Sequence, residues 1–124
     1  MVDRYPCPCC GHLVFDEPPG TYCICPICFW EDDVLQLVYP LMGGGPNALN
    51  LCEAQREYAR CGACEARLVP NVRRPEADEL LDPTWRPFDS ARDPYLRLDS
   101  AEDGELWQQR EWDVSGLYYW REDY

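Results

Sequence analysis

CPCCGHLVFDEPPGTYCICPIC, residues 7–28, contains two copies of a C-x2-C spacing. Two spacer residues let both thiolates of a pair turn toward one ion, and four thiolates in a tetrahedron select zinc or iron. The spacing therefore predicts a single structural zinc site. The predicted ligands are Cys7, Cys10, Cys25 and Cys28. Buried cysteines that merely pack are the weaker alternative, because two complete pairs in register rarely arise by packing alone.

The residues around the two pairs predict a small α+β fold of the zinc-ribbon type, with rubredoxin-like knuckles and short antiparallel strands. Residues 12–15 have strand character, and residues 21–24 form the expected returning arm of a hairpin. The alternating apolar residues 34–38 indicate a further strand. We expect Phe29 and Trp30 to pack over the metal and shield its thiolates from water.

An acidic run, Glu31-Asp32-Asp33, follows the second knuckle. Consecutive residues of a strand point to opposite faces, so the three carboxylates do not converge readily on one hard cation. We interpret the run as a solvated turn or a contact for a partner.

One central helix is predicted over residues 51–61. Asn50 and Glu53 have the spacing of a capping box at its start, and Gly62 is suited to end it in a left-handed conformation. Leu51, Ala54, Tyr58 and Cys61 then form its inner face.

The remaining cysteines leave alternatives open. Cys61 and Cys64 form another C-x2-C pair, which is typical of a redox dithiol or of a second zinc site. Redox-active pairs sit at a helix N-terminus, whereas this pair falls at a predicted C-terminus. A second zinc would need Cys9, His12 or Cys23 to complete it. We favour free or buried thiols for these cysteines, and a solvent-exposed strand position for His12.

Composition changes near residue 75, which divides the chain into a zinc-ribbon domain with one helix (1–75) and an acidic, aromatic-rich segment packed on it (76–124). The net charge is −12, and fourteen of the 23 acidic residues lie in the second part. A helix over 102–112 and a closing strand over 117–120 are expected there. Its tryptophans, Trp107 and Trp112 included, are either core residues or anchors of a protein interface.

Several stretches resemble the bacterial cysteine-rich CPCC domain family. YPCPCCG at residues 5–11 and CPICFWEDD at residues 25–33 carry the resemblance, which continues through residues 50–54 and 62–64 and covers about the first 75 residues. The resemblance implies a zinc-ribbon-like site at the same four ligand positions and assigns no biochemical role. Cys23 departs from the family pattern, which argues against it as a required ligand.

These features favour a small cytoplasmic zinc protein that binds another protein with a basic surface. An antidote to a basic effector is one form that this role could take. No apolar run is long enough to span a membrane, and the start of the chain does not resemble a signal peptide. In a reducing compartment, nine cysteines indicate metal ligands or free thiols rather than disulfides.

Three other classes of function are less favoured. A closed four-thiolate zinc site has no open position, and the sequence offers no nucleophile–base pair, so we expect no enzymatic activity. A rubredoxin-like iron or dithiol redox protein is the first alternative. A nucleic-acid-binding zinc ribbon is the second, although the negative charge repels phosphate.

Overall fold

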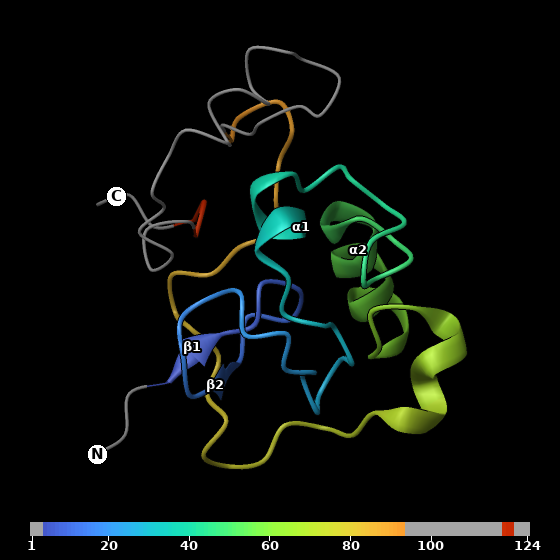
Figure 1. Cartoon of the computed structure of the whole chain (residues 1–124). Coiled ribbons are helices and arrows are strands. Elements are labelled where there is room, and N and C mark those ends of the chain that lie inside the picture. The colour runs from blue at the N-terminus through green and yellow to red at the C-terminus, as the bar shows by residue number, and fades with distance from the viewer. Residues whose placement is uncertain (1–3, 94–117, 121–124) are drawn as a thin grey trace.

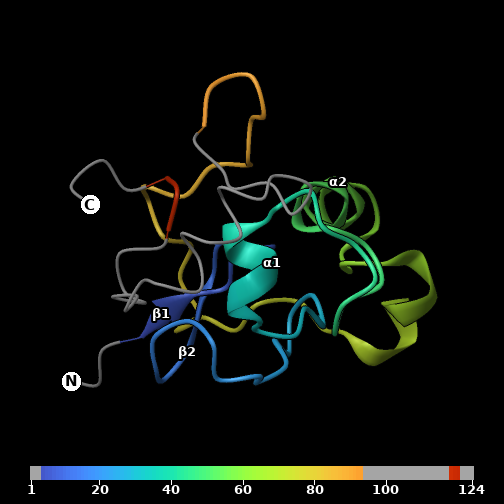
Figure 2. The ribbon, with the colours of Figure 1, turned by 45° about the horizontal axis from the view of Figure 1, so that its top comes forward.

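The chain forms a small α+β structure with two short strands and few helices (Figure 1). The computed structural model describes residues 4–93 and 118–120. Its elements are β1 (Tyr5–Pro6), β2 (Leu13–Phe15), α1 (Val34–Val38), α2 (Leu51–Cys61) and the 3-10 helix η1 (Ala66–Asn71). In the view of Figure 2, α1 lies between the two-stranded sheet and α2. The predicted α+β class agrees with this arrangement.

The small sheet pairs different segments from those expected. β2 lies within the predicted strand 12–15, but its antiparallel partner is β1, on the other side of the first knuckle. Residues 21–24 form no strand with β2. They pair instead with the residues after the second knuckle, through an isolated bridge between Ile24 and Glu31 and backbone hydrogen bonds to Asp32. The predicted returning arm is therefore wrong. Tyr22 has a φ of 61°, in the left-handed region, and this interrupts an extended strand.

Residues 34–38 form the helix α1, so the predicted strand there is also wrong. The Asp33 carboxylate accepts a hydrogen bond of 3.1 Å from the Gln36 backbone N–H and caps the helix. The Gln36 side chain is fully buried and its amide donates to the carbonyls of Met42 and Asn47. These contacts outweigh the β propensity of the two valines, because tertiary context readily overrides such preferences.

The acidic run is not the solvated turn that we expected. Asp32 and Asp33 are 2% and 4% exposed. The Asp32 carboxylate accepts hydrogen bonds from both N–H and hydroxyl of Thr21, at 3.3 and 3.0 Å. Burial raises the pKa of Asp32 above its usual range. These carboxylates hold the loop that leads into and out of the second knuckle.

The helix α2 agrees with the prediction at both ends. The Glu53 N–H donates to Asn50 Oδ1 at 2.8 Å, and the Asn50 N–H donates to Glu53 Oε1 at 3.3 Å. Gly62 ends the helix with a φ of 83°. Leu51 and Ala54 are fully buried, as expected for its inner face.

The C-terminal part packs partly on the knuckles. After η1 the chain returns to the sheet, where the Leu13 N–H donates to the Leu80 carbonyl at 2.8 Å (Figure 1). Tyr118 and Trp120 are 1% and 4% exposed and belong to the core, and residues 118–120 form a turn rather than the predicted strand. The predicted helix 102–112, with Trp107 and Trp112, lies outside the described residues. Within the described part, no helix has the length and apolarity to cross a membrane.

Candidate metal centre

The four predicted ligands lie together in the core. Their sulfur atoms are all within 4.8 Å of one another, with 3.6 Å between the sulfurs of Cys7 and Cys28 and 3.8 Å between those of Cys10 and Cys25. None of the four is more than 2% exposed. A tetrahedral zinc with Zn–S bonds of about 2.3 Å needs sulfurs about 3.8 Å apart. The four cysteines are therefore positioned to bind one metal ion.

The two knuckles share one backbone arrangement. In the first, the Gly11 N–H donates to the Cys7 carbonyl at 2.7 Å, and the Cys7 N–H donates to the His12 carbonyl at 2.9 Å. In the second, the Phe29 N–H donates to the Cys25 carbonyl at 2.9 Å, and the Cys25 N–H donates to the Trp30 carbonyl at 2.9 Å. The residue after each C-x2-C pair is left-handed, with a φ of 79° at Gly11 and 70° at Phe29.

The first knuckle is covered by the C-terminal part of the chain. We call residues 80–88 and 118–120 the C-terminal cover. The Pro8 carbonyl accepts hydrogen bonds from Trp85 Nε1 at 3.0 Å and from Gln55 Nε2 at 2.9 Å. A Cβ atom at Gly11 would come within 2.5 Å of the Trp85 ring. Only glycine fits here, because both the φ angle and the indole exclude a side chain.

Polar contacts tie the two pieces of the C-terminal cover together. The Asp82 N–H donates to the Gly11 carbonyl at 2.8 Å, and Trp120 Nε1 donates to the Asp82 carboxylate at 3.2 Å. The Tyr119 hydroxyl accepts from Gln55 Nε2 at 2.8 Å and donates to the Arg86 carbonyl at 2.6 Å. The first knuckle is thus sealed by residues more than 70 positions away from it.

The second knuckle is packed against the core by its own neighbours. Trp30 is 1% exposed and lies in the same apolar cluster as the four cysteines, with the half-buried Phe29 packed against it. This agrees with the packing expected of both aromatic residues. The Cys64 N–H donates to the Cys28 carbonyl at 2.7 Å. The loop after α2 thereby fixes the end of this knuckle.

Burial and hydrogen bonds between the thiols both shift the pKa values of the four cysteines. Burial raises the pKa of the Cys7 and Cys28 thiols well above their usual range. Hydrogen bonds from Cys10 and its neighbours instead lower the pKa of Cys25. Four thiolates cannot coexist in this space without a cation, so metal binding must release protons.

The other cysteines do not form a second site among the described residues, where the four-sulfur cluster is the one group of three or more potential ligands. Cys61 and Cys64 lie at and after the C-terminus of α2, as predicted. Burial raises the pKa of the Cys64 thiol to about 12, opposite to what a redox nucleophile needs. Cys23 is exposed, and Cys9 is buried outside the cluster.

His12 is neither a ligand in this cluster nor the exposed strand residue that we favoured. It is half-buried and bridges to Leu81, and its Nδ1 lies 2.8 Å from the Glu79 carbonyl oxygen. Sequence reasoning also missed Gln55 and Trp85, which hold the first knuckle through the Pro8 carbonyl. One local signal pointed to close packing over the first knuckle. The residue after the C-x2-C pair is Gly in the first knuckle and Phe in the second, and only the glycine leaves room for a side chain such as Trp85.

Comparison with known proteins identifies the family of this chain. The family model described as cysteine-rich CPCC matches residues 5–79, which is more than half of the chain. The protein therefore belongs to the cysteine-rich CPCC family, as the resemblance predicted. A search of curated proteins found no match.

Proposed function

We propose that this protein is a small zinc-binding module in which one structural zinc joins two knuckles, and that the module binds another protein with a basic surface. The observation that carries the zinc assignment is the spacing of the four buried sulfurs, which suits a tetrahedral ion. Bound zinc would supply a cross-link between residues 7–10 and 25–28. The chain's own aromatic residues and the C-terminal cover would keep water from the thiolates.

A structural role is supported by the closure of the site. All four cysteines are at most 2% exposed, so no face of the cluster is open to a substrate. Catalytic zinc sites keep one coordination position for water, whereas structural sites use four protein ligands. An enzymatic role is therefore not part of the proposal.

The proposed partner follows from charge. The sequence has 23 acidic residues against 11 basic ones. Such a surface attracts a basic protein, speeds its encounter and repels nucleic acid. An antidote that covers the basic surface of a nuclease-like effector is one form of this role. None of the nine cysteines forms a disulfide, which suits a reducing compartment such as the cytoplasm.

Iron is the second candidate metal, because the same four-thiolate set holds iron in rubredoxin-like proteins. Elemental analysis of protein purified from its native cells separates the two. We expect one zinc per chain and a colourless protein. A red, iron-loaded protein would move the proposal to electron transfer, and a metal-free folded protein would reject it.

The binding role has its own test. A partner captured from native cells should carry a basic surface, and its association should slow as salt rises past the physiological range, where screening shortens the reach of charge. A salt-insensitive partner with an acidic surface would contradict the proposed role without affecting the zinc assignment.

A further inference from the structure

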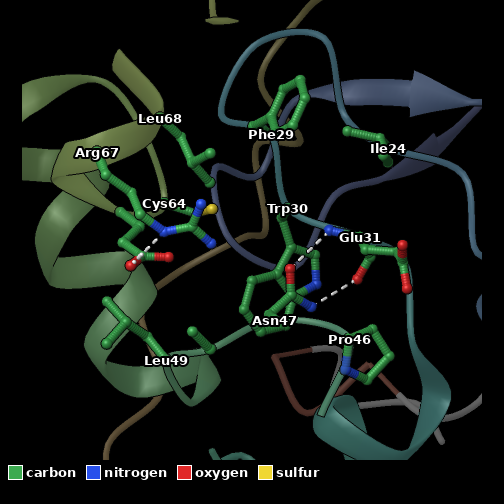
Figure 3. Close-up of a pocket in the computed structure, with 12 residues that line it drawn as sticks. Ile24, Phe29, Trp30, Glu31, Pro46, Asn47, Leu49, Cys64, Arg67 and Leu68 are labelled. Carbon is green, nitrogen blue, oxygen red and sulfur yellow. Dashed lines mark hydrogen bonds and ion pairs between the residues drawn. The ribbon is translucent and has the colours of Figure 1, made fainter. Parts of the chain in front are cut away.

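A cavity lies beside the second knuckle (Figure 3). It measures about 160 Å³ and is lined mainly by apolar side chains. Those that carry the argument are Ile24, Phe29, Leu49 and Leu68. An apolar cavity of about 150 Å³ is large enough to hold a benzene molecule. The space therefore fits one leucine- or phenylalanine-sized side chain.

Asn47 is the buried polar residue at the cavity wall, and its side chain is already hydrogen-bonded. Asn47 Oδ1 accepts from the Glu31 N–H at 2.8 Å, and Asn47 Nδ2 donates to the Glu31 carbonyl at 2.9 Å (Figure 3). An incoming apolar group would thus leave no buried polar atom of Asn47 without a partner. This favours an apolar occupant over a polar one.

The wall beside the knuckle combines a left-handed residue with an exposed apolar side chain. Phe29 adopts a left-handed conformation at a position where the first knuckle has glycine. It keeps a large half-buried ring at the cavity rather than a residue that would relieve the strain. Ile24, which also lines the cavity, is 47% exposed. Strained residues and exposed apolar side chains of this kind gather at binding sites.

The surroundings of the cavity are acidic. A shallow hollow between α2 and η1 adjoins it and shares Leu49, Glu65 and Arg67 with it. The charged side chains of the two hollows are Glu31, Glu53, Glu57, Glu65, Arg56 and Arg67. Glu65 is paired with Arg67 at 2.8 Å, and Glu57 with Arg60 at 2.7 Å. Glu31 and Glu53 then remain against Arg56, and this excess of one negative charge favours a basic neighbour. A second copy of this chain would bring a further charge of −12 and be repelled.

We propose that this cavity is the docking site for one apolar side chain of the partner protein, leucine- or phenylalanine-sized and flanked by lysine or arginine. The inference rests on the proposed binding role and locates it on the molecule. The apolar side chain acts as the anchor, and the flanking cations face the glutamates of the rim.

The probe is a displayed library of random 12-residue peptides, selected against the full-length, metal-loaded protein. Enriched peptides should share one Leu, Ile or Phe flanked by Lys or Arg. Their binding should shift the NMR signals of Ile24, Phe29 and Leu68. Ala48 is exposed and lines the cavity, so Ala48→Trp should fill its mouth without removing core packing. We expect this substitution to weaken peptide binding about tenfold or more, as the loss of a buried anchor does.

Ala59→Trp is the matched control, because Ala59 is exposed on α2 and does not line the cavity. It should leave peptide affinity unchanged, and both variants should keep their metal. The proposal is overturned if no peptides are enriched, if their consensus lacks an apolar anchor, or if Ala48→Trp binds them as well as the parent. Contacts between Leu68 methyls and residues 94–117 in the free protein, or a dimer that Ala48→Trp disrupts, would assign the cavity to this chain itself.

Metal analysis of the same samples keeps the two proposals apart. A parent protein that contains no zinc would reject the proposed zinc module. Intact zinc with basic peptides that bind elsewhere would keep the binding role and reject only this docking site.

Discussion

The two knuckles have the same spacing and the same backbone hydrogen bonds, yet they differ in what lies above them. The first carries Gly11 beneath Trp85 and is sealed by the C-terminal cover. The second carries Phe29 at the equivalent position, half-buried beside a cavity. The cysteine geometry thus fixes the backbone of both knuckles, whereas the packing above each one decides which residue can follow its second cysteine.

The residue after the second cysteine also determines how much backbone strain each knuckle carries. A residue with a Cβ atom in the left-handed region costs roughly 1–2 kcal/mol. The first knuckle avoids this cost with glycine, and the second accepts it at Phe29. A side chain retained at such a position indicates a use for the ring itself, either in packing against Trp30 or in binding.

The largest expected effect is common to both knuckles. Cys7→Ser and Cys28→Ser should each remove much of the metal's contribution to folding, which is on the order of 10 kcal/mol for thiolate zinc sites. Metal content and thermal denaturation would report the loss. Cys23→Ser is the control, because Cys23 is exposed, and it should cost about 1 kcal/mol or less. If Cys23→Ser released the metal as Cys7→Ser does, the ligand set would be wrong.

The next effect falls on the cover of the first knuckle. Trp120 is 4% exposed and bonds to Asp82, which in turn bonds to the Gly11 carbonyl. Trp120→Ala should therefore lower the free energy of unfolding of the isolated protein by about 3–5 kcal/mol. Chemical denaturation measures this directly. An unchanged midpoint would mean that Trp120 serves an interface and not the core.

A smaller effect should distinguish the knuckles themselves. Gly11→Ala adds a left-handed Cβ and a clash with Trp85, and should cost about 2–4 kcal/mol. Phe29→Gly relieves backbone strain but loses apolar packing, so its stability should change by about 1 kcal/mol or less. Thermal melts of the two variants provide the comparison. Equal losses at both positions would mean that the two knuckles are packed alike.

The smallest expected effect is the loss of stability at low pH when the ion pair between Arg73 and Glu79 is broken. Arg73 bonds to both oxygens of Glu79, at 2.6 and 2.9 Å, just before the C-terminal cover begins. These bonds lower the pKa of Glu79 below its usual range. Because the folded pKa is depressed, the ion pair stabilises the fold above the unfolded pKa and is lost as pH falls through the folded one. Because Arg73 is exposed to solvent, the contribution of the pair is small.

An NMR titration of the Glu79 carboxyl carbon tests this ion pair. Arg73→Gln should move the Glu79 midpoint upward, toward that of an unpaired glutamate. The exposed pair of Arg60 and Glu57 on α2 provides the control, since it should titrate identically in the parent and the variant. A Glu79 midpoint unaffected by Arg73→Gln would mean that the pair does not form in solution.

Local signals in the sequence were sufficient for some of these features. The ligand spacing and the capping box of α2 each involve residues a few positions apart, so the pattern alone predicts them. The segment 34–38 was too short for its periodicity to separate a strand from a helix, and the buried Gln36 decided the matter. The pairing of β1 with β2 escaped prediction because the hairpin turn chemistry at residues 16–20 favoured another partner.

Long-range packing left no comparable local signal. Trp85 reaches Pro8 across 77 positions, and Tyr119 reaches Gln55 across 64. Nothing in the neighbourhood of either aromatic residue indicates which carbonyl or amide it will meet. The aromatic content of the C-terminal part indicated burial, but only the three-dimensional structure locates it over the first knuckle.

X-ray absorption at the zinc edge, on protein purified without added metal, tests the central claim most directly. The account predicts one zinc per chain surrounded by four sulfur atoms at about 2.3 Å. The same spectrum should persist in Cys9→Ser and Cys23→Ser. A shell that contains nitrogen or oxygen, or a protein that holds no zinc, would contradict a structural zinc bound by Cys7, Cys10, Cys25 and Cys28.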